Sequence, residues 1–298
     1  MSDIVTSESL NLGKVLQVYA EAKPIATGVD EEHMHGVIEQ YLSALSKVDS
    51  AAILALFADD AQLIDPVGSE PCVRKKAIEE FMSSMLHGCR NPKLAAPIRT
   101  CIGNIAAVAF SIEFEQGDFE AEISIIDVVR FNSAGKIVSL EAHWGLDDIH
   151  MIRGDRGDLV AAFMPGKDPK DQADFQSHMR KAMQQYIDSI NLKDPAGLLK
   201  MYSEDVVAVD PMGTVPLHGL KTIASFYDQG MADRVDLECS IRTSFGRTAA
   251  MAFKVIFPME GRKIHIHTID VMTFDEAGRI IDIKAIWGRR NVKFKEKE

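Results

Sequence analysis

Apolar residues recur every three or four positions at the start of each half of the chain, a spacing that predicts amphipathic helices. The first helix carries Tyr41 on its apolar stripe, and its counterpart in the second half carries Tyr186. A second helix is predicted to begin at Asp49 and again at Asp194-Pro195, where aspartate is a favourable cap and proline suits the first helical position. Its apolar face is expected to comprise Ile53, Leu54 and Phe57 in one half and Leu198, Leu199 and Tyr202 in the other.

Behind these helices the apolar pattern alternates every second residue, which is typical of β-strands. The predicted strands span residues 105–115, 119–131, 137–145, 248–258, 264–274 and 280–288. Turns with a positive backbone φ are expected at Gly117, Gly135, Gly261 and Gly278. Helices followed by a meandering antiparallel sheet predict an α+β domain in which the helices cover one face of a curved sheet.

The whole order of elements occurs twice, so the chain is predicted to be a tandem repeat. Its 298 residues fit two domains of about 150 residues each. We expect these domains at residues 31–150 and 175–298, joined by a linker over 151–174 that is rich in glycine, proline and charge. Residues 1–30 form an N-terminal extension without a counterpart, in which residues 8–22 show helical periodicity.

Composition narrows the possible functions. Hydrophobic residues make up 46% of the chain, and no apolar run approaches the roughly 18 residues that span a bilayer. The N-terminus lacks the pattern of a signal or transit peptide, so a cytoplasmic location is expected. A net charge of −11 argues against nucleic acid or an anionic membrane as partner and favours a neutral or apolar ligand. The four cysteines have no CxxC spacing, which argues against a disulfide or zinc framework.

A single carboxyl interrupts the apolar face of one long strand in each half: Asp127 in the first and Asp270 in the second. Burial of an unpaired carboxylate is costly and raises its pKa, so these groups are expected to be protonated at neutral pH. A neutral carboxylic acid beside a buried tyrosine hydroxyl would supply two hydrogen-bond donors to an oxyanion. One such donor is typically worth about 10²–10³ in rate.

Asp65 and Asp210 have a different setting. Each follows a short strand-like run, precedes Pro-x-Gly, and lies at the same separation from the tyrosine of its half. Such a carboxylate is expected to face a cavity at the end of a strand and to act as a general base, worth roughly 10²–10⁴ in rate. Alone, the tyrosine would be read as core packing and the aspartate as a turn residue. Their joint recurrence in both halves favours a functional site.

Several motifs of the first half closely resemble ketosteroid isomerase, an enzyme of the nuclear-transport-factor-2-like (NTF2-like), or SnoaL-like, superfamily with a conical fold. They are Phe57-Ala-Asp-Asp-Ala61, Asp65-Pro-Val-Gly-Ser-Glu-Pro71 and Arg130-Phe-Asn-Ser-Ala-Gly-Lys136. The second half matches more weakly, through Asp210-Pro-Met-Gly-Thr-Val-Pro216 and Phe274-Asp-Glu-Ala-Gly-Arg279.

The resemblance implies an isomerase that needs no cofactor and shifts the double bond of a β,γ-unsaturated 3-ketosteroid into conjugation. Asp65 and Asp210 correspond to the base that moves the proton. Tyr41 with Asp127, and Tyr186 with Asp270, correspond to the oxyanion hole, in which the family keeps a carboxylic acid neutral in an apolar site. Trp144 and Trp287 match an aromatic residue of the steroid pocket.

The family enzyme is a single-domain homodimer, so the resemblance implies that the two halves pair within one chain as a pseudo-dimer, with further oligomerisation left open. Other reactions of the same fold, such as dehydration, cyclisation and epoxide hydrolysis, are alternatives, as is a binding protein for an apolar ligand. The second half has Thr214-Val215 where the first has Ser69-Glu70, so a difference in substrate or competence between the two sites stays open.

Overall fold

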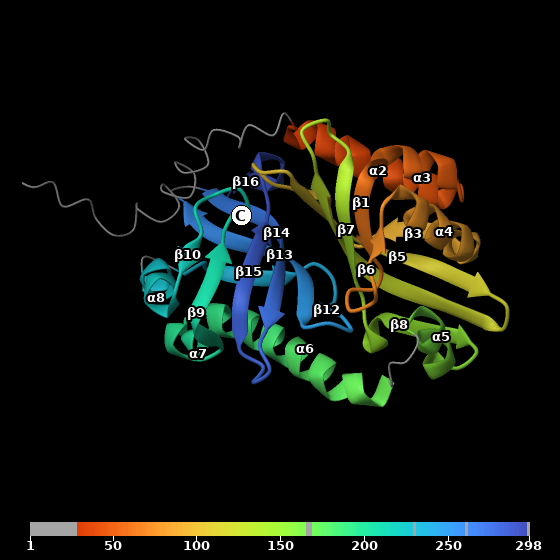
Figure 1. The fold of residues 1–298 in the computed structure, drawn as a ribbon. Coiled ribbons are helices and arrows are strands. Elements are labelled where there is room, and N and C mark those ends of the chain that lie inside the picture. The colour runs from red at the N-terminus through yellow and green to blue at the C-terminus, as the bar shows by residue number, and fades with distance from the viewer. Residues whose placement is uncertain (1–28, 165–168, 229–230, 260–261, 297–298) are drawn as a thin grey trace, which may run out of the picture.

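The chain forms two similar α+β units that lie side by side in the computed structural model, which describes residues 29–164, 169–228, 231–259 and 262–296 (Figure 1). The predicted helix over residues 8–22 and Gly261 lie outside this part of the chain. The helices of the first half are α2 (Glu31–Ser46), α3 (Ser50–Leu56), α4 (Lys75–Met85) and α5 (Arg156–Phe163), with 3-10 turns η1 (Leu86–Gly88) and η2 (Leu146–Asp148). Its strands are β1 (Phe57–Ile64), β2 (Cys72–Val73), β3 (Cys89–Leu94), β4 (Arg99–Thr100), β5 (Ile105–Gln116), β6 (Phe119–Phe131), β7 (Ile137–His143) and β8 (Ile149–Arg153).

The second half repeats this order. Its helices are α6 (Pro169–Asn191), α7 (Pro195–Leu199) and α8 (Leu220–Asp228), with the 3-10 turn η3 (Arg289–Asn291). Its strands are β9 (Tyr202–Val209), β10 (Leu217–His218), β11 (Arg234–Leu237), β12 (Arg242–Thr243), β13 (Thr248–Met259), β14 (Arg262–Phe274), β15 (Ile280–Ile286) and β16 (Val292–Glu296).

Each half contains one curved, mostly antiparallel sheet. The strand order is β2-β1-β7-β6-β5-β3 in the first half and β10-β9-β15-β14-β13-β11 in the second, and in each case two short strands pair off this path. The pairs β1–β7 and β9–β15 are parallel. The predicted α+β class is therefore confirmed, and the six predicted long strands coincide closely with β5, β6, β7, β13, β14 and β15. The turn glycines Gly117, Gly135 and Gly278 have the expected positive φ.

The helix starts predicted at Asp49 and Asp194 are confirmed. The Asp49 carboxylate accepts the Ala52 N–H at 2.9 Å, and that of Asp194 accepts the Gly197 N–H at 2.8 Å. The predicted ends were wrong, however, because Phe57 and Tyr202 are the first residues of β1 and β9 and not part of the helices. Each pairs with an isoleucine of a neighbouring strand, so sheet pairing prevails over helical spacing.

The segment 151–174, predicted as a linker, contains regular structure. Strand β8 continues to Arg153, and Asp155 caps α5 by accepting the N–H groups of Gly157 and Asp158. Leu159 and Val160 of α5 are buried in the core of the first half. The first core therefore draws on residues up to α5, although the division of the chain into domains otherwise stays a prediction.

The halves pack against each other through alanine and isoleucine side chains of their long strands. This cluster includes Ala107, Ala109 and Ile126 from the first half and Ala250, Ala252 and Ile269 from the second. Buried polar contacts flank it: the Asp148 carboxylate accepts the Thr243 N–H at 3.2 Å, and the side-chain Oδ1 of Asn291 accepts the Thr100 N–H at 3.2 Å. The predicted pairing of the halves within one chain thus has a well-packed contact surface.

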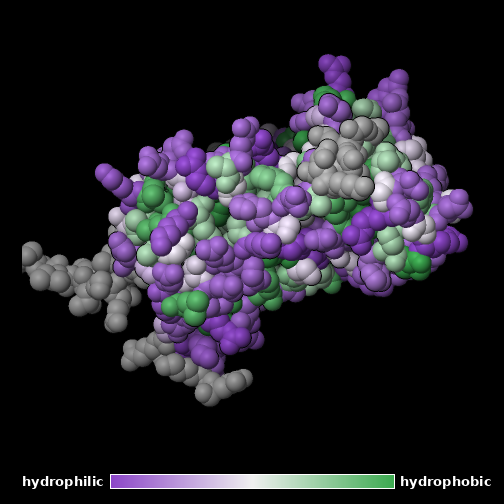
Figure 2. All heavy atoms as spheres, turned by 90° about the horizontal axis from the view of Figure 1, so that it is seen from below, coloured by the Kyte–Doolittle hydropathy of each residue, from purple (hydrophilic) through white to green (hydrophobic). Residues whose placement is uncertain are grey.

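The outer surface is mixed in character. On the face shown in Figure 2, apolar side chains occur in small groups between polar and charged ones. Within the described ranges, no helix is long and apolar enough to cross a membrane.

Candidate active site

In the first half, the predicted site residues converge on one pocket from four elements. Tyr41 comes from α2, Asp65 follows β1, Asp127 lies in the middle of β6, and Trp144 follows β7. Tyr41 lies on the buried stripe of α2, as its spacing predicted. The remainder of the pocket wall is apolar and includes Phe81, Phe110, Phe114, Ile123 and Phe163. The pocket therefore combines a few polar groups with a lining suited to an apolar ligand.

Asp65 is held by the indole of Trp144, whose Nε1–H donates to the carboxylate Oδ1 at 2.7 Å. Burial raises the pKa of Asp65 to about 6, although the tryptophan bond favours the charged form. Asp65 opens the loop of residues 65–68, named the base loop, whose counterpart in the second half is residues 210–213. The Val67 N–H donates to the carbonyl of Ala142 at 2.8 Å, which ties the base loop to β7. Asp65 is thus ionised at neutral pH and basic enough to accept a proton.

Asp127 has the opposite character. Its side chain is buried, and neither carboxyl oxygen makes a hydrogen bond of normal geometry, although the Tyr41 hydroxyl is close enough to lower its pKa. Burial, and then the charge of Asp65, raise its pKa well above the ordinary value. Burial also raises the pKa of Tyr41, with a further contribution from Asp127. Both groups therefore remain protonated at neutral pH and can donate hydrogen bonds into the pocket.

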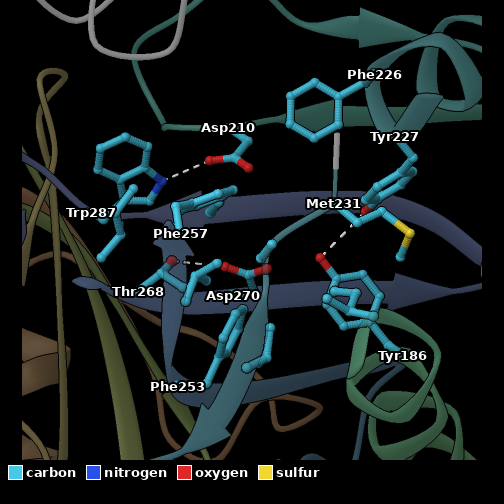
Figure 3. Close-up of a pocket in the computed structure, with 16 residues that line it drawn as sticks. Tyr186, Asp210, Phe226, Tyr227, Met231, Phe253, Phe257, Thr268, Asp270 and Trp287 are labelled. Carbon is cyan, nitrogen blue, oxygen red and sulfur yellow. Dashed lines mark hydrogen bonds between the residues drawn. The ribbon is translucent and has the colours of Figure 1, made fainter. Parts of the chain in front are cut away.

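The second half builds the same arrangement, seen in Figure 3. Tyr186 of α6, Asp210 after β9, Asp270 of β14 and Trp287 after β15 line one pocket. The Trp287 Nε1–H donates to Asp210 Oδ1 at 2.7 Å, the same contact as in the first half. Burial raises the pKa of Asp210 and raises that of Asp270 well above its ordinary value. Both halves therefore pair a basic carboxylate with two protonated donors.

Comparison with known proteins assigns this repeated arrangement to a family. A model of the SnoaL-like domain matches residues 38–140 and again residues 183–283. The chain belongs to the SnoaL-like family. The double match agrees with the tandem repeat, and the two sheets with their preceding helices are two NTF2-like α+β units.

Two known proteins are similar to this chain. A steroid Δ-isomerase from Nocardioides simplex is 36% identical over 112 residues, which cover 38% of this chain and 89% of that enzyme. The epoxide hydrolase LasB from Streptomyces lasalocidi is 22% identical over 280 residues, covering 85% of this chain and 93% of that enzyme. One relative thus matches a single SnoaL-like unit closely, whereas the other spans both units at lower identity.

The second SnoaL-like unit holds polar residues that the sequence analysis missed. The Tyr227 hydroxyl of α8 donates to the Tyr186 hydroxyl at 3.4 Å and lies 3.2 Å from the Tyr202 hydroxyl of β9. Thr268 Oγ1 donates to Asp270 Oδ1 at 2.8 Å. Figure 3 shows Tyr227 and Thr268 beside the groups they contact.

At the equivalent positions the first unit has only apolar residues, namely Phe57, Met82 and Ile125. An alignment of the two repeats would have revealed these polar residues, because each stands opposite an apolar residue of the first repeat. They were missed because Tyr202 was assigned to the apolar face of a helix, and because α8 was not predicted at all.

No metal centre emerges from the described residues, in which no three His, Cys, Asp or Glu side chains gather as a ligand set. The closely spaced pairs His33/His35 and His265/His267 could suggest metal ligands, but members of both pairs make other contacts. For example, His33 Nε2 lies 3.0 Å from the Gly135 carbonyl, and His267 Nδ1 lies 2.7 Å from Glu238.

Proposed function

We propose that the protein is a steroid Δ-isomerase that shifts the double bond of a β,γ-unsaturated 3-ketosteroid into conjugation. The observation that supports this most strongly is the pairing, in each apolar pocket, of a tryptophan-bound carboxylate with a buried carboxyl of raised pKa. One group suits proton abstraction, and the other suits stabilisation of the negative charge that abstraction creates.

In this mechanism Asp65 or Asp210 removes a proton from the carbon between the ketone and the double bond. The C–H electrons form a new C=C bond, and the negative charge passes to the ketone oxygen, giving a dienolate. The carboxylic acid formed on the base then returns the same proton to the far end of the dienolate. The reaction is internally balanced, because the proton and the electrons all come from the substrate.

Tyr41 with Asp127, and Tyr186 with Asp270, are the proposed donors to the dienolate oxygen. Their raised pKa values keep them protonated at neutral pH, so each offers an O–H to the developing charge. Donors already fixed in a dry pocket are effective because they require little reorganisation during the reaction. Trp144 and Trp287 orient the bases and contribute an aromatic wall to each pocket.

Epoxide hydrolysis is a second candidate, supported by the relative LasB, which matches both halves of the chain. A protonated Asp127 or Asp270 could donate to an epoxide oxygen while the ionised aspartate activates water. The products separate the two reactions, since hydrolysis adds the elements of water and isomerisation conserves the mass of the substrate.

Formation of the conjugated enone from a β,γ-unsaturated 3-ketosteroid, followed by ultraviolet absorbance, tests the proposal. Asp65→Asn and Asp210→Asn should each lower the turnover of their own site by roughly 10²–10⁴. The double variant should be inactive, while steroid binding persists because the amide is nearly isosteric.

With Asp210→Asn in place, kcat/KM should decline as the pH falls below about 6, where Asp65 becomes protonated. Absence of enone with the folded wild-type protein would refute the assignment.

A further inference from the structure

Each site has a loop of the other half beside it, and in the first site this loop contacts the tryptophan directly. Phe245 follows β12 in the second half, yet its side chain is buried in the hydrophobic core of the first half. Its ring lies edge-on to that of Trp144, with centroids 5.9 Å apart and an interplanar angle of 87°. Phe245 does not line the pocket itself, so its contact with the site runs through Trp144.

Trp144 is also held by a ring of its own half, since Phe163 of α5 lies edge-on to it at 5.2 Å. Two edge-on rings therefore set the plane of the indole whose N–H reaches Asp65 at 2.7 Å. The hydrogen bond depends on that plane, because the indole N–H has a single direction in which to donate. Loss of one supporting ring would let the donor swing away from the carboxylate.

The backbone of the same loop holds the base loop directly. The N–H groups of Phe245 and Gly246 both donate to the carbonyl of Val67, at 3.0 Å and 3.1 Å. Gly68, the next residue, has φ +105°, and a Cβ built there would lie 2.4 Å from the carbonyl carbon of Phe245. The glycine of the Asp-Pro-x-Gly motif therefore leaves room for the loop of the other half.

A related contact lies beside the second site. Ile102, which follows β4 in the first half, packs against the cluster that contains Trp287 of the second site. Gly213 has φ +98°, and a Cβ there would lie 2.6 Å from the backbone nitrogen of Gly103. Ile102 occupies the position that Phe245 has in the opposite contact. The side chain that packs beside the second site is therefore the smaller of the two.

We propose that Phe245 and Ile102 are positioning residues, each of which orients the tryptophan and the base loop of the site in the opposite half. Neither half then completes its own site, which gives a physical reason for the two units to stay joined in one chain. The geometric claim is independent of the reaction, whereas its consequence for turnover rests on the proposed isomerase function.

The chain has only two tryptophans, one in each site, so their indole ¹⁵N–H signals report on the sites separately. In the full-length protein, Phe245→Ala should shift the Trp144 signal and leave that of Trp287 in place. Ile102→Ala should shift the Trp287 signal and leave that of Trp144 in place, although Ile102 lies in the half that contains Trp144. Retention of the other signal at its wild-type position shows that each variant remains folded. In Phe245→Leu the Trp144 signal should lie between its positions in Phe245→Ala and in the wild type.

The pH at the midpoint of the Trp144 signal's titration distinguishes a positioning role from a merely structural one, because only a change in the indole bond to Asp65 should move it. In the wild type the signal should follow the ionisation of Asp65, near pH 6. In Phe245→Ala the midpoint should rise, because a weaker indole bond stabilises the carboxylate less. The proposal is overturned if the midpoint is unchanged, or if Phe245→Ala and Ile102→Ala shift both indole signals alike.

Measurement of turnover provides a second test of the positioning role. Phe245→Ala should lower kcat by about 10- to 100-fold when only the first site is active, in the Asp210→Asn background. Its effect should be much smaller in the Asp65→Asn background, where only the second site remains. Equal losses in both backgrounds would contradict the proposal. If no substrate is turned over, the isomerase assignment fails while the indole signals still decide the positioning role.

Discussion

Asp127 and Asp270 hold equivalent positions on β6 and β14, yet their carboxyl groups have different surroundings. Asp270 accepts a hydrogen bond from Thr268 at 2.8 Å, whereas both oxygens of Asp127 are buried without a hydrogen bond of normal geometry, although the Tyr41 hydroxyl is close enough to lower the pKa of Asp127. An unpartnered polar group is rare in a folded core, because its lost hydration is not replaced. At Asp127 this cost is most simply explained by function, since a bound ligand would supply the missing hydrogen bond.

The buried carboxyl of Asp127 should make stability depend on pH. Its folded-state pKa is raised by burial, so the folded protein holds a proton that the unfolded chain releases above about pH 4. Its contribution to the free energy of unfolding is therefore complete at low pH and is lost as the pH rises towards the folded-state pKa. Asp127→Asn cannot titrate, and it should gain stability relative to wild type between pH 5 and pH 8.

Urea unfolding at these two pH values measures the effect. Asp60→Asn, at an exposed position on β1, is the matched control and should show no comparable gain. A difference between Asp127→Asn and wild type that stays constant from pH 5 to pH 8 would show that the carboxyl does not carry a buried proton.

At the scale of elements, two side chains that are polar in only one of the two units lie on the helix that follows the loop after β1 or β9, and on the first strand of the sheet. In the second unit α8 and β9 supply Tyr227 and Tyr202, which connect to Tyr186 through their hydroxyl groups. The first unit has apolar residues in both places. Under the proposed function, the Tyr227 hydroxyl bond would polarise Tyr186, the proposed donor of the second site, since chains of hydrogen bonds strengthen one another.

Tyr227→Phe tests this connection in the Asp65→Asn background, where only the second site works. Loss of one neutral hydrogen bond should lower kcat by roughly 2- to 10-fold. Tyr202→Phe is the control, because it removes a hydroxyl that contacts Tyr227 and leaves the bond from Tyr227 to Tyr186 in place. Steady-state rates of enone formation would contradict the connection if Tyr202→Phe proved the more harmful of the two.

The sequence predicted the elements that depend on local periodicity and missed those that depend on distant contacts. The long strands β5 and β6 alternate regularly, and their ends were placed closely. Helix α5 was missed because its segment is short and lies between glycine- and proline-rich stretches; its burial comes from contact with the first core. The residues of each predicted site converge on one pocket, but the contact of Phe245 with Trp144 follows only from how the two halves pack.

At the scale of the whole molecule, the contact between the halves places Asp148 and Asn291 in matching positions that differ in charge. Asp148 and Asn291 each bind a backbone N–H of their own turn and one of the opposite half. Asp148 also lies 3.3 Å from Arg180 and 3.8 Å from Arg242, whereas the Asn291 amide donates to the Ile98 carbonyl at 2.9 Å. The two residues therefore fill matching places with different requirements for donors and charge.

Asn291→Asp should show how strictly this difference is needed. The new carboxylate keeps both acceptor contacts but loses the donor to Ile98, and it places a charge in a buried site. At pH 8 the free energy of unfolding should fall by about 1–3 kcal/mol. Burial favours the protonated acid, which regains a donor, so the loss should be smaller at pH 5.

Asn291→Ala removes all three contacts without adding a charge, and its cost should not vary with pH. Urea unfolding of both variants at pH 5 and pH 8 measures the difference, and an equal pH response in the two would mean that the buried charge plays no part. Because Asn291 joins η3 to β4 of the opposite half, the destabilisation should appear in both tryptophan signals together, as expected if the two halves unfold as one unit.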